Sequence, residues 1–540
     1  MRDEITSGIP SPDGPANTIE TDYQIGQDNI ERQFGPFGLD IHNPVFAISS
    51  IIIVAFVLVT LAFQDEVGPL YGDLRVWLTE TLDWFFIGAA NVFVLLCLFL
   101  IVSPLGKIRI GGRDAVPDYG YPGWFAMLFA AGMGIGLMFF GVSEPISHYS
   151  SSVAEGAGGP DSWAPLAGAA GNPEEARRLG MASTIFHWGL HPWAVYAIVA
   201  LALALFTFNK GLPLTVRSVL YPIFGDRVWG WTGHIIDVIA VFATLFGLAT
   251  SLGFGAEQAN AGLEFLFGIP ATDASKVILI VSITAVALGS VLMGLDAGVK
   301  RLSEINMVLA SLLLLFVIFA GPTMEIVSGF FDNLAAYVEY LPALSNPAGR
   351  TDTNFSAGWT AFYWAWWISW SPFVGMFIAR VSRGRTVREF IICVLLIPSV
   401  VSVLWMTAFG GTAISQIVND GYQAVADAAL ELKLFVMLQQ LPFTSIASFV
   451  GIVLVIVFFT TSSDSGSLVI DTITAGGKTD APVSQRVFWC SFEGLVAIAL
   501  LLGGGLASLQ AMAVSTGFPF TIILLLACYA IVRGLMDEPR

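Results

Sequence analysis

Long apolar runs recur along the whole chain and are separated by short polar segments. Each run is long enough to cross the roughly 30 Å hydrocarbon core of a bilayer as a helix. A helix satisfies its own backbone hydrogen bonds, which lipid cannot do. The sequence therefore predicts an all-α polytopic membrane protein. Its twelve transmembrane helices are expected at about residues 44–64, 84–104, 122–142, 182–207, 231–256, 276–295, 305–328, 357–379, 389–411, 447–473, 486–505 and 509–533.

The composition agrees with this pattern. Of the 540 residues, 55% are hydrophobic and only 12% are charged, and the mean hydropathy is +0.75, outside the usual range of soluble domains. All four cysteines fall inside predicted spans, so we expect them to pack there rather than to form disulfides or a metal site. They are Cys97, Cys393, Cys490 and Cys528.

The placement of basic residues predicts the orientation in the membrane. With the N-terminus in the cytoplasm, most of the 24 Lys and Arg residues fall in cytoplasmic segments. This positive-inside bias places both termini in the cytoplasm of a multi-pass protein of the plasma (inner) membrane. Residues 1–43 are polar and acidic and are predicted to form a flexible cytoplasmic tail. The net charge of −17 argues against nucleic acid as a partner, because nucleic-acid binding needs a basic face.

The third predicted span contains AAGMGIG at 130–136. Each of its three glycines lowers helix propensity by about 1 kcal/mol relative to alanine. Gly132 and Gly136 suit close helix packing. Gly134 adds little to such packing, but it favours an unwound backbone that offers N–H and C=O groups to a ligand.

The eighth span has a second weak point at Ser369, Ser371 and Pro372, because proline removes a backbone donor and frees the carbonyl one turn earlier. Spans three and eight are five apart. If spans 3–7 and 8–12 are repeats, their odd number of helices makes the second copy inverted in the membrane. Interrupted helices at matching places in two inverted repeats indicate the binding site of a secondary transporter.

Tryptophan is concentrated beside this second weak point, in WAWWISW at 364–370. On a helix, the side chains of Tyr363, Trp366, Trp367 and Trp370 form one aromatic stripe. Tryptophans commonly anchor a helix at the membrane interface. This cluster fits that explanation poorly, because it lies a third to a half of the way along its span.

The fourth span carries a second aromatic group in HWGLHPWAVY at 187–196. Trp188, Trp193 and Tyr196 fall within roughly 140° of one another on a helix. Two aromatic faces on separate helices predict a box that binds a bulky cation such as a quaternary ammonium group. Each ring contact would contribute about 0.5–2 kcal/mol.

His187 and His191 in this span have the i, i+4 spacing of metal ligands. No glutamate follows the first histidine and no third ligand is evident, so the HExxH pattern of metalloproteases is absent. We expect one histidine to pack against its neighbours and the other to make a structural hydrogen bond.

Four stretches resemble the betaine/choline/carnitine transporter family: GMGIGLMFFGVSEP (132–145), WGLHPWAVY (188–196), FYWAWWISWSPFVGMFIARVSRGRT (362–386) and FFTTSSDS (458–465). The resemblance runs from about residue 44 to the last span, and the third stretch is highly specific to the family. It implies the LeuT-like fold of two inverted five-helix repeats, often in a homotrimer. The implied parts are two peripheral N-terminal helices (44–118), the first repeat (119–329), an amphipathic surface helix and loop (330–356), the second repeat (357–535) and a short cytoplasmic C-terminus (536–540).

The resemblance also implies the substrate-binding residues: Trp188, Trp193, Tyr196, Trp366, Trp367 and Trp370, with the backbone of Ala131, Met133, Gly134 and Ile135. Choline carriers of the family typically have an aspartate where this chain has Gly136, and that acid would compensate the net charge of choline. A betaine carries its own carboxylate. Gly136 therefore favours a zwitterionic quaternary-ammonium or sulfonium substrate, either glycine betaine or dimethylsulfoniopropionate.

Sodium is the coupling ion that the resemblance implies, and no other cofactor is expected. One site would use backbone carbonyls and hydroxyl oxygens, which are the hard ligands that sodium needs. The implied ligands are Ala130, Met133, Phe458, Thr461 and Ser462. The hydroxyls of Thr461 and Ser462 could instead bond to the preceding helical turn.

A second sodium site is in doubt. Sodium-coupled relatives use two threonines near a phenylalanine ring, and this chain has Thr244 and Phe373 but Leu248 in place of the second threonine. The number of sodium ions therefore stays open. Asp464, within the tenth span, is a further functional candidate as an intramembrane acid. A proton relay, an inner gate and a structural hydrogen bond are its alternative roles.

Together these features predict a symporter that works by alternating access, with substrate, sodium and membrane lipid as partners. A sodium-independent betaine- or carnitine-type exchanger and a choline transporter are the alternatives. An ion channel fits less well, because the aromatic box would obstruct a wet pore. An enzyme would need a nucleophile–base pair or a metal constellation, and the sequence shows neither.

Overall fold

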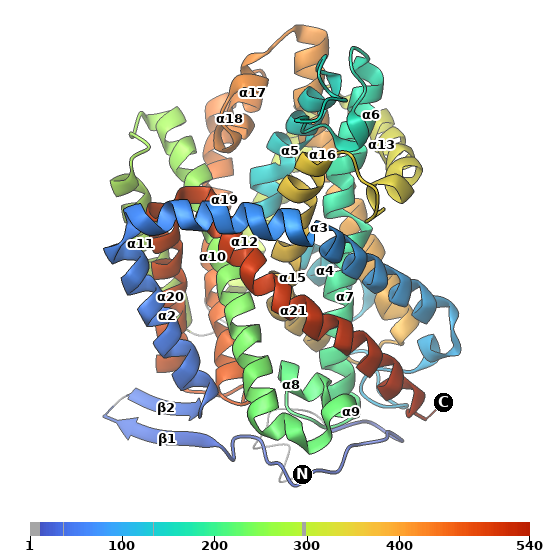
Figure 1. Ribbon diagram of the computed structural model, residues 1–540, viewed down its shortest axis with the longest axis vertical. Helices are drawn as coiled ribbons and strands as arrows, with labels where there is room; N and C mark the ends of the chain where they lie inside the picture. Colours follow the sequence, from blue (N-terminus) through green and yellow to red (C-terminus); the bar gives the residue numbers. More distant parts are fainter. Residues whose placement is uncertain (1–10, 36, 133, 294–298, 540) are drawn as a thin grey trace.

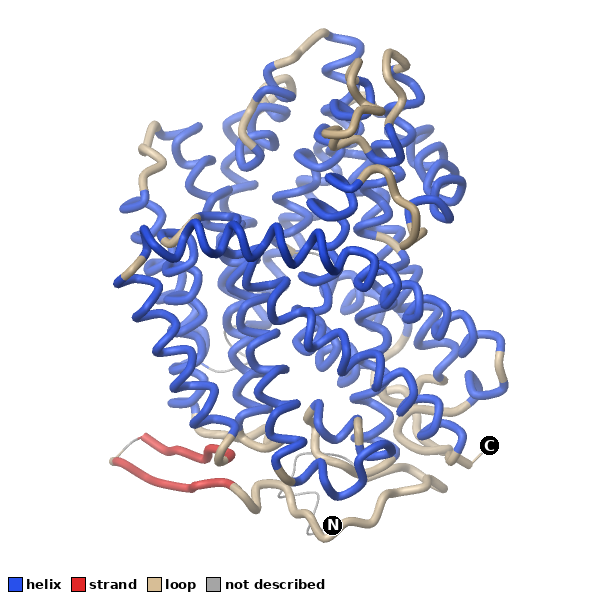
Figure 2. The backbone as a smooth tube through the Cα atoms, in the orientation of Figure 1, coloured by secondary structure: helices blue, strands red, loops and turns tan. Residues whose placement is uncertain are grey.

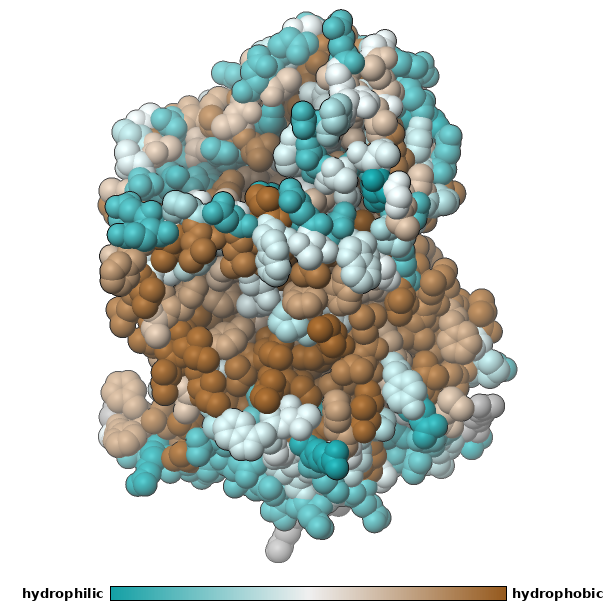
Figure 3. All heavy atoms as spheres, in the orientation of Figure 1, coloured by the Kyte–Doolittle hydropathy of each residue, from teal (hydrophilic) through white to brown (hydrophobic). Residues whose placement is uncertain are grey.

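The computed structural model describes residues 11–35, 37–132, 134–293 and 299–539. Helices make up most of the molecule (Figures 1 and 2). A two-stranded antiparallel hairpin, β1 (Asn29–Phe34) and β2 (Phe37–His42), lies at the end of the molecule that also holds the N-terminus. Figure 3 shows a broad apolar band between polar ends, as expected of a protein that spans a bilayer.

Ten helices in the described part of the chain are long and apolar enough to cross a membrane, which confirms a multi-pass membrane protein. One of the spans is irregular, because it consists of α6, α7 and a π-helical turn, η3. The spans are α2 (Val45–Ala62), α3 (Gln64–Val102), α6 (Pro173–Trp188) with α7 (Leu190–Ala204) and η3 (Leu205–Asn209), α10 (Trp231–Phe267), α11 (Asp273–Met293), α12 (Val299–Ala320), α16 (Val387–Asp420), α19 (Thr444–Thr474), α20 (Val483–Leu502) and α21 (Gly505–Met536).

The third and eighth predicted spans are not among these ten, for two different reasons. The third is divided into α4 (Tyr121–Gly132) and α5 (Ile135–Val153), as its glycines predicted. The eighth, α15 (Phe362–Val381), is one helix of 20 residues, but its tryptophans, tyrosine and serines make it less apolar than a plain span. The total of twelve spans and their grouping into inverted repeats stay predictions.

The predicted break at Pro372 is wrong, because α15 runs through this proline without interruption. Pro372 has no N–H to donate to the carbonyl of Ile368. The Ser371 hydroxyl donates to that carbonyl instead, at 2.6 Å, so no backbone acceptor is left free. Irregular backbone comes before α15, in the short α14 (Thr353–Phe355) and the π-helical η5 (Ser356–Ala361).

The fourth span, which we predicted as one helix, is interrupted at Gly189 between α6 and α7. Gly189 has φ −99° and ψ −127°, which is not helical. The N–H of Leu190, freed by this break, donates to the Tyr337 hydroxyl at 3.1 Å. Tyr337 belongs to α13 (Thr323–Leu344), the predicted amphipathic surface helix, which begins seven residues before the predicted start at 330.

The N-terminal segment differs from the flexible tail that its acidic composition predicted, because residues 29–34 and 37–42 form the two strands of the hairpin and contact the helices. Lys478 Nζ lies 2.9 Å from Glu31 and 2.6 Å from Asp40. His42, at the end of β2, is fully buried. Burial, and then the positive charge of Arg217, lower the pKa of His42 to about 3, so it is neutral at physiological pH.

Short elements complete the chain at the two polar ends. Some lie beside the hairpin, and α17 and α18 lie at the opposite end (Figure 1). The short elements are η1 (Pro104–Lys107), η2 (Pro165–Ala167), α8 (Val216–Val219), α9 (Tyr221–Phe224), η4 (Gly225–Trp229), α17 (Ala424–Asp427), η6 (Leu430–Leu432) and α18 (Lys433–Leu438).

A buried ion pair joins the N-terminal segment to the helices. Arg217 of α8 and Asp237 of α10 are both fully buried, and Arg217 Nε lies 3.0 Å from an Asp237 carboxylate oxygen. The guanidinium also faces the rings of Tyr23 and Trp229, which stack at 4.2 Å. Removing one member of such a pair leaves the other charge buried and uncompensated.

We predict that Arg217→Met lowers the free energy of unfolding by about 3–5 kcal/mol, because the Asp237 carboxylate is left without its partner. The thermal unfolding midpoint of the detergent-solubilised protein measures this. Arg227→Met, at an exposed position in the same connection, is the matched control and should leave the midpoint unchanged. Equal midpoints for the two variants would show that the pair does not stabilise this end.

Candidate functional site

The break between α4 and α5 opens onto a small cavity lined by residues of α5, α6, α7, α10 and α15. Its volume is about 40 Å³. Aromatic side chains and the backbone at the break form its wall, and its lining residues are Gly134, Ile135, Gly136, Leu137, Trp188, Tyr196, Ser251, Trp366, Trp367 and Trp370. We refer to this cavity as the central pocket. It has room for a few water molecules, so the rings must move apart to admit a larger ligand.

The two predicted aromatic groups meet in the central pocket around Trp367. Its ring centroid lies 5.3 Å from Trp188, 5.0 Å from Tyr196 and 6.0 Å from Trp193. The angles between these ring planes range from 55° to 77°, so edges meet faces instead of stacking. Trp193 does not line the pocket but packs behind Tyr196 and Trp367, so it supports the wall. Trp366 donates its indole N–H to the Ser251 hydroxyl at 3.2 Å.

The backbone part of the predicted site is placed as follows. Gly134 is extended, with φ −167° and ψ −176°, and Gly134 and Ile135 line the pocket. Ala131 is in the last turn of α4. Met133 lies outside the described residues. Ser251 also lines the central pocket but was not among the predicted site residues, because its local sequence has no feature typical of a binding residue.

Gly136 is where α5 approaches the rings most closely. A Cβ atom at this position would lie 2.6 Å from Cη2 of Trp188 and 3.0 Å from Cη2 of Trp366. Real Cβ atoms do not come so close to other atoms, so any side chain here would push the rings aside. The close packing of the Trp188 and Trp366 rings against Gly136 therefore leaves no room for an acidic side chain at this position.

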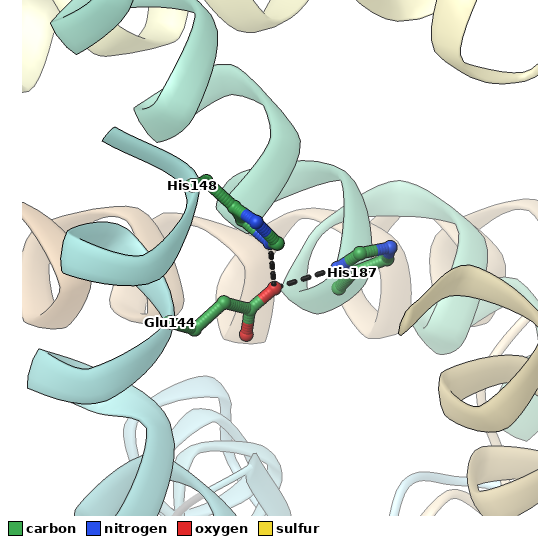
Figure 4. Close-up of side chains that lie close together, drawn as sticks. All are labelled: Glu144, His148 and His187. Atoms are coloured by element: carbon green, nitrogen blue, oxygen red, sulfur yellow. Dashed lines mark hydrogen bonds and ion pairs between the residues drawn. The ribbon is translucent and has the colours of Figure 1, made fainter. Parts of the chain in front are cut away.

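Glu144 of α5 is fully buried, and His148 and His187 both point toward its carboxylate (Figure 4). One oxygen accepts from the Trp188 indole N–H at 2.7 Å and from the Tyr363 hydroxyl at 2.5 Å. The other lies 2.6 Å from His187 Nδ1 and 3.1 Å from His148 Nε2. Glu144 thus holds the ring of Trp188 in position through a hydrogen bond on the side away from the pocket.

Sequence reasoning missed this network. Its signal was present in the intramembrane Glu144 and in its i, i+4 spacing to His148, but we considered only His187 and His191. Glu144, His148 and His187 bring metal-ligand atoms within 4.8 Å of one another. Because both Glu144 oxygens already accept hydrogen bonds, we assign the group to positioning rather than to metal binding.

The two predicted histidines make structural contacts. His187 stacks on Tyr363 with centroids 4.6 Å apart, and its Nε2 lies 2.9 Å from the Thr360 hydroxyl. His191 Nε2 lies 2.9 Å from the side-chain oxygen of Asn91. Both histidines therefore form hydrogen bonds, whereas we expected only one to do so.

A second cavity, of about 140 Å³, brings together the predicted sodium ligands that the structure describes. Ala130, Phe458, Thr461 and Ser462 line it, with Trp370 and Phe373. We call it the polar cavity. The Thr461 hydroxyl donates to the Val457 carbonyl at 3.0 Å, so the alternative of a bond to the preceding turn is realised here.

Three polar residues that we did not predict also line the polar cavity: Ser303, Asn306 and Ser465. The side-chain oxygen of Asn306 is buried and has no hydrogen-bond partner among the described residues. Such an oxygen is a suitable ligand for a hard cation. Ser303 and Asn306 belong to α12, whose apolar pattern does not reveal which of its polar residues turn inward.

The doubtful second sodium site, with Thr244 and Phe373, stays a prediction. Phe373 lines the polar cavity, but Thr244 lines neither this cavity nor the central pocket. The Thr244 hydroxyl donates to the Ala240 carbonyl at 2.7 Å, within its own helix. Leu248 packs against Gly466 of α19, where a Cβ would lie 2.3 Å from a Leu248 methyl group.

Asp464 belongs to a separate buried group. One carboxylate oxygen lies 3.2 Å from Arg486 Nη2, and the other accepts from the Ser290 hydroxyl at 2.5 Å. These contacts join α11, α19 and α20. Of its three alternative roles, the structural hydrogen bond is the one that the geometry shows.

We predict that Glu144→Met destabilises the protein by about 2–6 kcal/mol, because at least the Trp188 and Tyr363 donors lose their acceptor and each unpaired donor costs about 1–3 kcal/mol. The near-ultraviolet circular dichroism of the tryptophans should change as well. Thermal unfolding and this spectrum are the measurements, and Glu264→Met, at an exposed position of α10, is the control. An unchanged spectrum would contradict the positioning role.

Comparison with known proteins places the chain in a family. The model of the BCCT family, described as betaine/carnitine/choline family transporter, matches residues 44–540. A glycine betaine/proline/choline transporter of Vibrio parahaemolyticus is 68% identical and covers 100% of this chain and 98% of its own length. Glycine betaine transporter 1 of the same organism is 53% identical over 96% and 97% of the two chains.

Two further matches have lower sequence identity. The glycine betaine transporter OpuD of Bacillus subtilis is 43% identical over 92% of this chain and 95% of its own. The solved structure of a Na⁺-coupled sialic acid symporter is 14% identical, covers 84% of this chain and 86% of its own, and has a TM-score of 0.46, which is too weak a likeness to support an assignment. The sequence relatives are transporters rather than enzymes. This chain therefore belongs to the betaine/carnitine/choline transporter family.

Proposed function

We propose that this protein takes up a zwitterionic onium compound, glycine betaine or dimethylsulfoniopropionate, by sodium-coupled symport with alternating access. The observation that carries the proposal is the central pocket, where Trp188, Tyr196, Trp366, Trp367 and Trp370 surround a break in the backbone of a membrane helix. The pocket offers aromatic rings to the cationic end of such a molecule and unwound backbone to its anionic end. The relatives named for glycine betaine support this substrate class.

The aromatic rings suit the cationic end of the substrate. A methylated ammonium or sulfonium group has no N–H donors, so it gains little from hydrogen bonds and much from the negative faces of rings. The hydrogen bond from Trp188 to the Glu144 carboxylate adds negative charge behind one of these rings. No acid needs to enter the pocket itself, which agrees with glycine at position 136.

The break between α4 and α5 suits the anionic end. The first N–H groups of α5 have no partner within their helix, and the positive end of a helix dipole favours a carboxylate. Unwound backbone facing substrate is typical of binding sites in transporters built from broken helices.

The position of Trp370 supports the proposed coupling to sodium. This residue lines both the central pocket and the polar cavity. The polar cavity offers hydroxyl groups from Thr461 and Ser462 and the amide oxygen of Asn306, all hard ligands for sodium. A substrate or ion bound in one cavity would therefore affect binding in the other through the Trp370 side chain.

The remaining features of the proposal concern orientation and assembly. The positive-inside bias of the basic residues supports an orientation with the hairpin end and both termini in the cytoplasm, and with the protein in the inner membrane. Helix α13 exposes Met324, Phe331 and Val338 on one side. We assign this apolar face to contacts with lipid or with other subunits of a homotrimer.

Choline is a second candidate substrate. A relative with 68% identity is named for glycine betaine, proline and choline. The buried Glu144 beside the wall of the central pocket supplies a negative charge that a net cation requires. A transporter of broader specificity is therefore consistent with the same pocket.

The test is uptake of radiolabelled glycine betaine into proteoliposomes, with and without an inward sodium gradient and with unlabelled dimethylsulfoniopropionate and choline as competitors. We expect accumulation that depends on sodium and is blocked by the sulfonium compound. Competition by choline would extend the specificity. Uptake that is indifferent to sodium but accelerated by internal substrate would instead identify an exchanger.

We further predict that Thr461→Ala and Ser462→Ala each raise the sodium concentration for half-maximal uptake by about tenfold, as expected when one ion ligand worth about 1.4 kcal/mol is removed. Thr460→Ala is the matched control, because the Thr460 hydroxyl donates to the Ile456 carbonyl and does not line the polar cavity. If all three variants respond to sodium alike, the ion is held elsewhere.

A further inference from the structure

The break in the chain at Gly189 lies directly beside the aromatic wall of the central pocket. Trp188, the last residue of α6, lines the pocket, and α7 begins at Leu190. Pro192, in the first turn of α7, has no N–H to donate to the Trp188 carbonyl four residues earlier. On its C-terminal side, the backbone of Trp188 is therefore not held by the regular hydrogen bonds of a helix.

Tyr337 of the surface helix α13 contacts the chain at this break. Its hydroxyl oxygen accepts the N–H of Leu190 at 3.1 Å. A Cβ atom at Gly189 would lie 3.2 Å from the same oxygen and 2.8 Å from the carbonyl oxygen of Ile185, so the hydroxyl packs directly on the break. Tyr337 is only 7% exposed, so water competes little for its hydrogen bond to the backbone.

Contacts along α13 hold Tyr337 in place. One turn before it, the side-chain amide of Asn333 donates to the Thr407 hydroxyl of α16 at 2.9 Å. An ion pair between Arg178 and Glu339 joins α13 to α6. The Tyr337 hydroxyl is therefore carried by a helix that is fixed to two of its neighbours.

Two hydrogen bonds on opposite sides of Trp188 set the position of its ring. Glu144 accepts the indole N–H at 2.7 Å, and Tyr337 accepts the backbone N–H two residues further along the chain. The ring itself lies 5.3 Å from Trp367 across the central pocket wall. A ring that is already in place loses little conformational entropy when it binds a cation.

We propose that Tyr337 is a positioning residue for substrate binding: by holding the break at Gly189, its hydroxyl sets the Trp188 ring for contact with the onium group. The inference rests on the proposed function, because it assumes that a methylated cation binds at this ring. Tyr337 does not line the central pocket, so it acts on the substrate through Trp188. Without the hydroxyl, the Leu190 N–H has no partner at membrane depth, which favours a rearrangement of the break that moves the ring.

The test is the Tyr337→Phe variant, measured by uptake of radiolabelled glycine betaine into proteoliposomes. Removing the hydroxyl should raise the KM about tenfold, because a buried donor loses its partner in the arrangement that binds substrate. The maximal rate per folded transporter should stay close to that of the wild type. A purely structural role would lower the amount of folded protein and leave the KM unchanged.

Tyr340→Phe is the matched control. Tyr340 lies three residues further along α13, and its hydroxyl donates to Glu175 in the first turn of α6, away from the break. The KM of this variant should equal that of the wild type. A tenfold rise in both variants would assign the effect to the docking of α13 as a whole and would overturn the specific role of Tyr337.

Gly189→Ala is an independent variant of the same break, and it serves alone if Tyr337→Phe does not fold. Its Cβ meets the Ile185 carbonyl and the Tyr337 hydroxyl, so we expect a similar rise in KM. Two changes that act through one break are not additive. The double variant should therefore have the KM of either single variant and not the product of the two effects.

A wild-type KM in Tyr337→Phe, or multiplied effects in the double variant, would overturn the positioning role while leaving betaine uptake by the wild type intact. Wild-type protein that takes up no betaine would instead overturn the proposed function, and this role with it. The two failures are therefore distinguishable.

Discussion

Lipid cannot pair with a free backbone group, and this constraint organises the centre of the molecule. The chain leaves helical geometry between α4 and α5 and again at Gly189, and both breaks release N–H and C=O groups at membrane depth. Such groups are tolerated only where protein encloses them. In the α6–α7 span, 94% of the residues of one apolar 18-residue stretch are accordingly buried, whereas the corresponding share is 28% in the outer helices α2, α11 and α12.

Aromatic side chains enclose the central pocket, and hydrogen bonds on the side away from the pocket fix their positions. Glu144 accepts the indole N–H of Trp188 and the hydroxyl of Tyr363, and His187 stacks on Tyr363. In a medium of low dielectric, a hydrogen bond to a carboxylate is strong and an unpaired donor is costly. The wall of the central pocket is therefore rigid on its outer side, while the side that faces the pocket is left free to meet a ligand.

The position of the three cavities connects this construction to transport. The central pocket shares Trp370 with the polar cavity. On another side, the rings of Phe140 and Phe254 pack against Trp366 and also line a third cavity, of about 480 Å³. In the proposed symport mechanism, one of these sides would close while the other opens. The two phenylalanine rings would act as the barrier on the side opposite the hairpin.

Sequence alone was sufficient for the membrane class, the break at Gly134, the aromatic residues of the central pocket and the family, because these depend on hydrophobic periodicity, glycine and local motifs. Tertiary structure decided the rest. Ser371 takes over the carbonyl that Pro372 leaves free, so α15 does not break. Ser251 and Asn306 reach the cavities, and Glu144 reaches the back of the Trp188 ring, from segments far apart in the chain. The contacts between inward-facing polar groups depend on how the helices pack against one another, and no local sequence pattern encodes this packing.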